Sequence, residues 1–187
     1  MTVLERLKAL RELMKERKID AYLVPTDDFH ASEYVGDYFK CRKYITGFTG
    51  SAGTAVIMQD MAGLWTDGRY FLQAADQLEG STIQLFKMGE PEVPTVHQFL
   101  ADKLEKGMCL GFDGRTVTAR EADKLEELLR EKEITFSVND DLIGEIWNDR
   151  PALSCEPVME LDVKWAGESR ADKIAKIRKQ MKEKKAD

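Results

Sequence analysis

The sequence predicts an α/β fold in which a mixed β-sheet carries helices on its faces. Two features of its order lead to this prediction. Short apolar segments with strand character follow one another in the first half, and strands and helices alternate strictly in the second half. Strands that follow each other directly pair antiparallel, whereas strand–helix–strand units pair parallel, so one sheet of both kinds is expected.

The first eighteen residues predict the first helix. The apolar residues at helical spacing, with charged residues between them, are Val3, Leu4, Leu7, Leu10, Leu13 and Met14. Thr2 precedes this run and Glu5 follows three residues later, which is the pattern of a capping box. The helix is therefore expected to begin directly after Thr2.

The other elements follow from apolar runs and the polar or glycine-rich breaks between them. Strands are expected at residues 19–25, 51–60, 61–67, 83–89, 108–113 and 134–139. A short turn around Gln59 and Asp60 is expected to join the second strand to the third. Helices are expected at residues 69–78, 95–105, 118–132 and 140–148, and a further short helix is expected to open near Ser32.

The charge distribution argues against a nucleic acid as the main partner. The chain of 187 residues has a net charge of −6, and its lysines and arginines are spread along it rather than gathered in one block. Phosphate binding requires a concentrated basic face. The apolar stretches are too short to span a bilayer, and the charged N-terminal segment has no apolar region typical of a signal peptide.

The cysteines indicate a reducing compartment. Cys41, Cys109 and Cys155 are odd in number, widely spaced and without a Cys-x-x-Cys pair, so disulfides and zinc knuckles are not expected. The sequence therefore predicts a cytoplasmic protein.

The segment 149–165 differs in kind from what precedes it. It contains Pro151 and Pro157, has no clear period, and predicts an extended linker. A new amphipathic helix with a Ser N-cap follows. We expect one domain over residues 1–151, and in 152–187 a linker with the first helix of a second domain that the chain only begins. In the alternative, this last helix docks back on the first domain.

Residues 25–34 gather side chains of the types that ligate metals. Asp27, Asp28, His30 and Glu33 lie close together in the sequence, but their spacing matches no known metal cage. Capping and hydrogen bonds within a turn explain the acids equally well. A contact with a ligand or another domain is the remaining alternative.

Residues 45–54 form a glycine-rich segment. Gly47, Gly50 and Gly53 alternate with hydroxyl side chains, and such a loop can present backbone N–H groups to an anion. The segment lacks the ending of a P-loop, and a strand follows it where a dinucleotide fingerprint has a helix. The alternative is a tight loop that lets backbone segments approach closely.

Arg69 is predicted in the first turn of a helix, directly after Asp67 and Gly68. A cation at that position opposes the helix macrodipole, at a cost of roughly 0.3–1 kcal/mol. Arg69 should therefore have an anionic partner. That partner is either Asp67 or a group from outside the domain, and a guanidinium is well shaped to bind a carboxylate.

No complete catalytic site is recognisable in the sequence. The two histidines, His30 and His97, are far apart, and no His-Glu-x-x-His motif or nucleophile elbow is present. The chain is therefore expected to be inactive alone and to work as part of a larger enzyme.

Five segments resemble the N-terminal domain of Xaa-Pro aminopeptidases, a domain shared in looser form with creatinase and prolidase. They are IDAYLVPTDDFHASEY, YITGFTGSAGTAVI, LWTDGRYFLQAADQL, KMGEPEVPT and NDDLIGEIWNDRP, which together cover most of residues 19–151 in order. The resemblance is to the three-domain cytosolic type. It implies a ribonuclease-H-like mixed sheet over residues 1–151.

The resemblance also implies a function. Enzymes of this family release the N-terminal residue from peptides with proline second, using two divalent metal ions, usually manganese, in a C-terminal domain absent from this chain. By matching position, Arg69 would contact the substrate peptide, while Asp67, His30 and Asp28 are candidates for contacts in the cleft or between domains. No metal ligand or catalytic residue is expected within the 187 residues.

The resemblance further implies partners for the chain. These are the middle and catalytic domains that follow it and a peptide substrate; the full-length protein would be a homodimer and this chain alone a monomer. Two other functions remain open. One is a stand-alone module that binds a small anion through Gly47 to Gly53 and Arg69, and the other is a regulatory domain of a chain that has lost its metal ligands.

Overall fold

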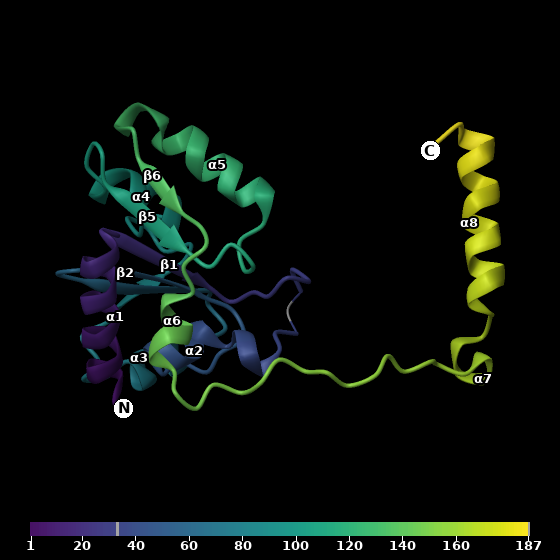
Figure 1. Cartoon of the computed structure of the whole chain (residues 1–187), viewed down its shortest axis with the longest axis horizontal. Helices are drawn as coiled ribbons and strands as arrows, with labels where there is room; N and C mark the ends of the chain where they lie inside the picture. The colour runs from purple at the N-terminus through teal and green to yellow at the C-terminus, as the bar shows by residue number, and fades with distance from the viewer. Residues whose placement is uncertain (33, 187) are drawn as a thin grey trace. The chain divides into compact units, whose positions relative to one another are not determined.

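The computed structural model describes residues 1–32 and 34–186, and the chain divides into two compact units. The first unit is Met1–Ser154 and the second is Cys155–Asp187. The first unit contains the whole β-sheet and most of the helices (Figure 1). No helix among the described residues is long and apolar enough to cross a membrane.

The sheet has six strands in the order β4-β3-β2-β1-β5-β6. β2 pairs antiparallel with both of its neighbours, β1 and β3. The other three pairs, β1 with β5, β3 with β4 and β5 with β6, are parallel. Every strand except β2 therefore runs in the same direction. The strands are β1 Ala21–Pro25, β2 Thr54–Met58, β3 Ala62–Thr66, β4 Gln84–Lys87, β5 Cys109–Phe112 and β6 Thr135–Ser137.

The helices of the first unit lie on both faces of this sheet. They are α1 Val3–Arg17, α2 Cys41–Thr46, α3 Phe71–Gln77, α4 Val96–Lys103, α5 Ala119–Leu129 and α6 Leu142–Ile146, with 3-10 turns at Asp37–Phe39 and Arg130–Lys132. One core cluster joins α1, α2, α3 and α6 to the sheet, and a second joins α4 and α5. Tyr22 belongs to the first cluster and the adjacent Leu23 to the second, as the alternation of a strand requires.

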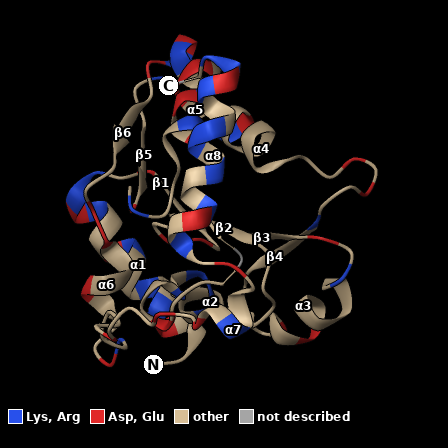
Figure 2. Cartoon of the chain, turned by 90° about the vertical axis from the view of Figure 1, so that its right-hand side faces the viewer, with Lys and Arg blue, Asp and Glu red and all other residues tan. Residues whose placement is uncertain are grey.

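The mixed sheet with helices on its faces confirms the predicted fold class. The capping box of α1 is also present: Glu5 N–H donates to Thr2 Oγ1 at 3.3 Å and Thr2 N–H donates to Glu5 Oε2 at 2.7 Å. Of the apolar residues of α1, Leu7, Leu10 and Met14 are buried, whereas Leu4 is exposed. Basic and acidic residues both occur along the helices of the chain (Figure 2).

The predicted helix near Ser32 is wrong. After the 3-10 turn the chain forms α2, whereas residues 26–32 and 34–36 form a loop. The Asp28 carboxylate accepts hydrogen bonds from the backbone N–H groups of His30 and Gly36, at 2.8 and 3.4 Å. Because these donors lie six residues apart along the loop, Asp28 closes it rather than capping a helix.

The second unit contains α7 Val163–Ala166 and α8 Arg170–Lys184. Ser169 is the N-cap of α8, and its hydroxyl accepts a hydrogen bond from Asp172 N–H at 3.1 Å, as the sequence predicted for this helix.

Candidate functional site

The three segments that the sequence singled out meet at one edge of the sheet. Residues 25–34 follow β1, residues 45–54 end where β2 begins, and Asp67 follows β3. Since β2 is antiparallel to its neighbours, its first residue lies beside the last residues of β1 and β3. Ligands of open α/β sheets bind preferentially at this carboxyl edge.

Arg69 lies in the turn between β3 and α3 and is paired with Asp67. Its Nε and Nη2 atoms donate to the two carboxylate oxygens of Asp67 at 2.8 and 2.7 Å, and its backbone N–H donates to Oδ1 at 3.0 Å. The hydrogen bonds from the Arg69 side chain are the main reason why the pKa of Asp67 is lowered. The Arg69 side chain is 66% exposed, so the paired guanidinium is displayed at the surface.

The structure corrects the predicted position of Arg69 within the helix. α3 begins at Phe71, so Arg69 precedes the helix instead of occupying its first turn. Its local partner is Asp67, one of the two alternatives that the sequence left open.

The same three-residue arrangement occurs a second time, which the sequence analysis missed. Asp113 and Arg115, separated by one glycine, follow β5 and form an equivalent pair, with Arg115 Nε and Nη2 at 2.9 and 2.8 Å from the Asp113 oxygens. Arg115 also donates to Asp141 at 2.6 Å and to Tyr38 Oη at 3.2 Å. The Asp-Gly-Arg repeat is visible in the sequence and would have indicated an Asx turn at both strand ends.

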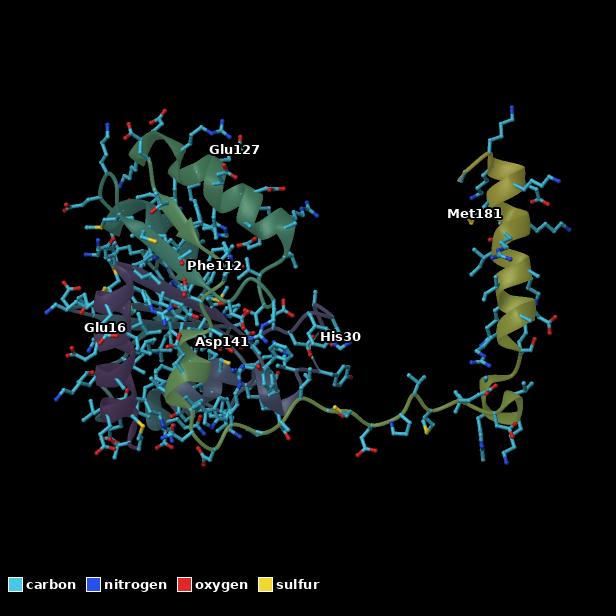
Figure 3. The ribbon with its side chains drawn as sticks, viewed as in Figure 1. Glu16, His30, Phe112, Glu127, Asp141 and Met181 are labelled. Atoms are coloured by element: carbon cyan, nitrogen blue, oxygen red, sulfur yellow. The ribbon has the colours of Figure 1, made fainter. Side chains whose placement is uncertain are left out.

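Asp28 and His30 lie in the loop after β1, where they interact with each other. Asp28 is buried, with 6% of its surface exposed, and His30 Nδ1 lies 3.3 Å from its Oδ1. His30 projects from the periphery of the unit (Figure 3). Of the other members of the predicted group, Asp27 accepts a hydrogen bond from Asp28 N–H, and Glu33 lies outside the described residues. Among described residues, no three His, Cys, Asp or Glu side chains are grouped so that they could hold a metal ion.

The Asp28 carboxylate makes the stability of the fold depend on pH. Burial alone raises the pKa of Asp28, but hydrogen bonds from His30 and Gly36 outweigh burial, and the pKa is lowered. A lowered pKa means that the ionised form stabilises the folded state above the unfolded value of about 3.9. That contribution is lost as the pH falls through the folded pKa.

We therefore expect Asp28→Asn to reduce the free energy of unfolding at pH 7 by about 1–3 kcal/mol, since a buried acceptor of charged hydrogen bonds is lost. The difference from the unaltered protein should shrink below about pH 4. Urea denaturation at both pH values measures this, with Asp76→Asn at an exposed position of α3 as the control. A difference that is the same at both pH values would contradict the role of the ionised carboxylate.

The glycine-rich loop packs closely against aromatic rings and backbone. A Cβ atom on Gly50 would lie 2.3 Å from the ring of Phe48 and 2.8 Å from that of Tyr70, and one on Gly53 would lie 2.9 Å from the carbonyl oxygen of Trp65. These distances favour the alternative of a tight loop that allows close approach. The Ser51 hydroxyl of the loop lies 2.8 Å from Oη of Tyr70, the residue that precedes α3.

The close approach at Gly50 predicts a clear effect of substitution. Gly50→Ala should destabilise the fold by roughly 1–3 kcal/mol, because Phe48 or Tyr70 must shift. Gly36→Ala is the matched control, since nothing lies within 4 Å of a Cβ there and φ is −62°. Thermal melts of both variants measure the difference, and equal melting temperatures would contradict the packing argument.

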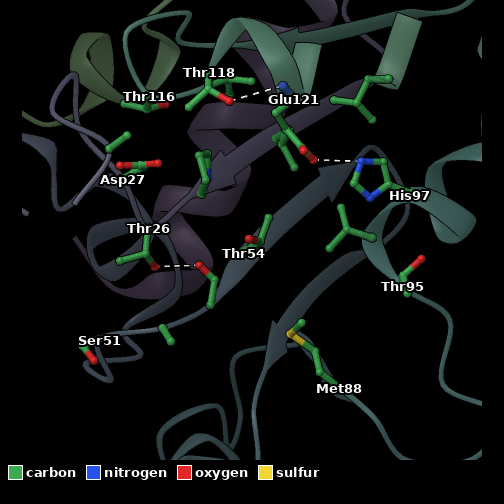
Figure 4. Close-up of a pocket in the computed structure, with 18 of the residues that line it drawn as sticks. Thr26, Asp27, Ser51, Thr54, Met88, Thr95, His97, Thr116, Thr118 and Glu121 are labelled. Carbon is green, nitrogen blue, oxygen red and sulfur yellow. Dashed lines mark hydrogen bonds and ion pairs between the residues drawn. The ribbon is translucent and has the colours of Figure 1, made fainter. Parts of the chain in front are cut away.

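A pocket of about 680 Å³ opens at the same edge, between the end of β1, the start of β2 and helices α4 and α5. Figure 4 shows threonine hydroxyls on its walls and His97 turned toward Glu121. His97 Nε2 lies 2.8 Å from Glu121 Oε1, although it has no aligned hydrogen-bond partner among the described residues. This pair could not be predicted from the sequence, because only the packing of α4 against α5 brings the two residues together.

The fold and these motifs place the chain in a known family. Models of the creatinase/prolidase N-terminal domain match residues 6–143 and residues 149–187. The chain belongs to the creatinase/prolidase N-terminal domain family.

Its relatives are peptidases considerably longer than this chain. It is 44% identical over 185 residues to a probable Xaa-Pro aminopeptidase P of Laccaria bicolor, covering 98% of this chain and 29% of that protein. Aminopeptidase P2 of Arabidopsis thaliana is 43% identical over 95% of this chain and 26% of its own length. This chain therefore corresponds to the N-terminal part of such proteins and spans less than a third of their length.

A solved structure matches the whole chain. The crystal structure of X-prolyl aminopeptidase from Caenorhabditis elegans, a cytosolic enzyme with a di-nuclear active site, superposes with a TM-score of 0.89 at 39% identity. The match covers 99% of this chain and 32% of that chain.

Proposed function

We propose that this chain is the N-terminal domain of a metal-dependent Xaa-Pro aminopeptidase, which releases the N-terminal residue from peptides whose second residue is proline. The observation that carries the proposal is the identity of 43–44% to Xaa-Pro aminopeptidases over nearly the whole chain. The catalytic centre, with two divalent metal ions that we take to be manganese, belongs to a domain that follows this chain. The 187 residues alone are inactive.

Arg69 acts in this proposal as a contact for the peptide. Two observations support the role: the guanidinium is 66% exposed at the carboxyl edge of the sheet, and Asp67 holds it in one orientation by two side-chain hydrogen bonds. An oriented arginine at the surface can bind a peptide carbonyl or carboxylate without first ordering its own side chain. Asp67 then serves as the positioning residue, and His30 and Asp28 shape the neighbouring wall or contact a following domain.

The proposal extends to the organisation of the full-length protein. Residues 1–151 form the N-terminal domain, and residues 152–187 form a linker and the beginning of a second domain, in keeping with the separate family match over residues 149–187. The full-length protein is a cytoplasmic homodimer, and the present chain alone is a monomer.

The specificity of the full-length gene product tests this function. We expect hydrolysis of Xaa-Pro peptides in the presence of Mn²⁺, with release of the N-terminal residue, and much slower hydrolysis of the matched Xaa-Ala peptides. Chelation of the metal should abolish both. Equal rates on the two peptide series would contradict the proposed substrate class.

A further inference from the structure

Arg42, on α2, is a buried arginine whose described partners are all uncharged. Only 4% of its surface is exposed. Nε donates to Thr26 Oγ1 at 2.9 Å, Nη1 donates to the Phe48 carbonyl at 2.5 Å, and Nη2 donates to the Gly50 carbonyl. Within the part of the chain that the structure describes, no carboxylate pairs with it.

The buried guanidinium therefore carries a charge that its described surroundings do not neutralise. Burial lowers the pKa of Arg42 to about 10, which leaves it protonated at neutral pH. A guanidinium has five N–H donors, and the described partners of Arg42 use three. A buried charge without a counter-ion is costly, so an anion that reached the remaining donors would be bound favourably.

A pocket gives access to this guanidinium. It measures about 290 Å³, and among the described residues its charged lining is Arg42, Lys40 and Lys43, without an acidic side chain. The hydroxyl-bearing residues Thr49 and Ser51 complete one wall. The volume corresponds to about ten water molecules at ~30 Å³ each, enough for a small anionic group. Lys40 is already paired with Asp37, so the positive charge of the described lining rests chiefly on Arg42 and Lys43.

The local geometry favours a carboxylate over a phosphate. Phosphate cradles in proteins use several free backbone N–H groups. Here the loop turns its Phe48 and Gly50 carbonyls toward Arg42, and Thr49 N–H donates instead to Gln77 Oε1 at 2.8 Å. A guanidinium fork matches the two oxygens of a carboxylate.

We propose that the pocket lined by Arg42, Lys40 and Lys43 binds a carboxylate group. The group is either an Asp or Glu side chain from elsewhere in the full-length protein or the free carboxylate of a peptide. The site is separate from the Arg69–Asp67 pair, and the proposal does not depend on peptidase activity.

Binding of N-acetylglycine to the ¹⁵N-labelled chain tests the site, with the uncharged N-acetylglycinamide as the matched ligand. We expect saturable shifts of the Thr49, Gly50 and Ser51 amide signals with a dissociation constant of the order of millimolar, and no saturation with the amide. Lys43→Gln should weaken binding about two- to fivefold, as for an exposed cation, whereas Lys8→Gln on α1 should leave it unchanged.

Three results would overturn the proposal. They are equal shifts with the two ligands, equal affinities of the Lys43→Gln and Lys8→Gln variants, and tighter binding of inorganic phosphate than of N-acetylglycine. Arg42→Lys, which keeps the charge and loses the fork, should weaken binding more than Lys43→Gln. If Arg42→Lys does not fold, the comparison of the two ligands and the comparison of Lys43→Gln with Lys8→Gln still test whether the pocket binds a carboxylate.

Binding of N-acetylglycine to the full-length gene product identifies the source of the carboxylate. Loss of N-acetylglycine binding there would identify a carboxylate supplied by the protein itself. Binding equal to that of the 187-residue chain would identify a site open to a peptide carboxylate.

Discussion

Arg69→Ala in the full-length gene product is expected to lower kcat/KM for Xaa-Pro peptides by about 5- to 150-fold, or about 1–3 kcal/mol, the usual range for a charge-assisted hydrogen bond. The physical reason is that Asp67 already fixes the guanidinium in one orientation at the surface. The proposed contact with the peptide should therefore contribute to binding without a large loss of side-chain entropy.

Two further variants make this result specific. Arg69→Lys keeps the positive charge but loses the planar fork, so it should recover only part of the activity. Arg120→Ala removes an exposed arginine of α5 and should leave kcat/KM unchanged. Steady-state kinetics on peptides of several lengths measure all three, and an Arg69→Ala enzyme with unchanged kcat and KM would contradict the contact.

Trp65→Ala is expected to have the largest effect on stability, a loss of about 3–5 kcal/mol. Trp65 is fully buried, stacks on Phe86 with ring centres 4.0 Å apart, and meets Phe99 edge-on at 4.9 Å. Its Nε1 also donates to the Pro94 carbonyl at 2.8 Å. The substitution removes a large side chain from the core between β3, β4 and α4 and leaves the Pro94 acceptor without its partner.

Trp165→Ala is the matched control for this substitution. Trp165 is 74% exposed, in α7 of the second unit, and its replacement should change the unfolding of the first unit by less than about 0.5 kcal/mol. Denaturation followed by circular dichroism measures both variants, because the change in fluorescence would otherwise be confused with unfolding. A loss below about 1 kcal/mol for Trp65→Ala would contradict the described packing.

Features encoded by neighbouring residues could be predicted from the sequence. The capping box of Thr2 and Glu5 and the buried stripe of α1 depend on contacts within one or two helical turns, and both are found as predicted. The strand positions also follow from local apolar runs. The helix predicted near Ser32 failed because a single buried carboxylate, Asp28, binds N–H groups six residues apart and holds the chain in a loop.

The candidate site could be predicted only in part. Arg69 and Asp67 were identified because they are close in sequence and their pairing is local. His97 and Glu121 could not be paired in advance, since they belong to different helices that meet only in the folded chain. The role of Arg42 was also hidden, because a basic residue in a charged segment gives no indication that tertiary packing will bury it to 4% exposure.

The comparison of Xaa-Pro peptide hydrolysis by the 187-residue chain and by the full-length gene product, both with added Mn²⁺, tests the central claim most directly. The account predicts activity in the full-length protein and none in the chain alone, because the proposal assigns the metal centre to a domain that follows this chain. Hydrolysis by the 187-residue chain itself, or none by a folded, metal-loaded full-length protein, would contradict it.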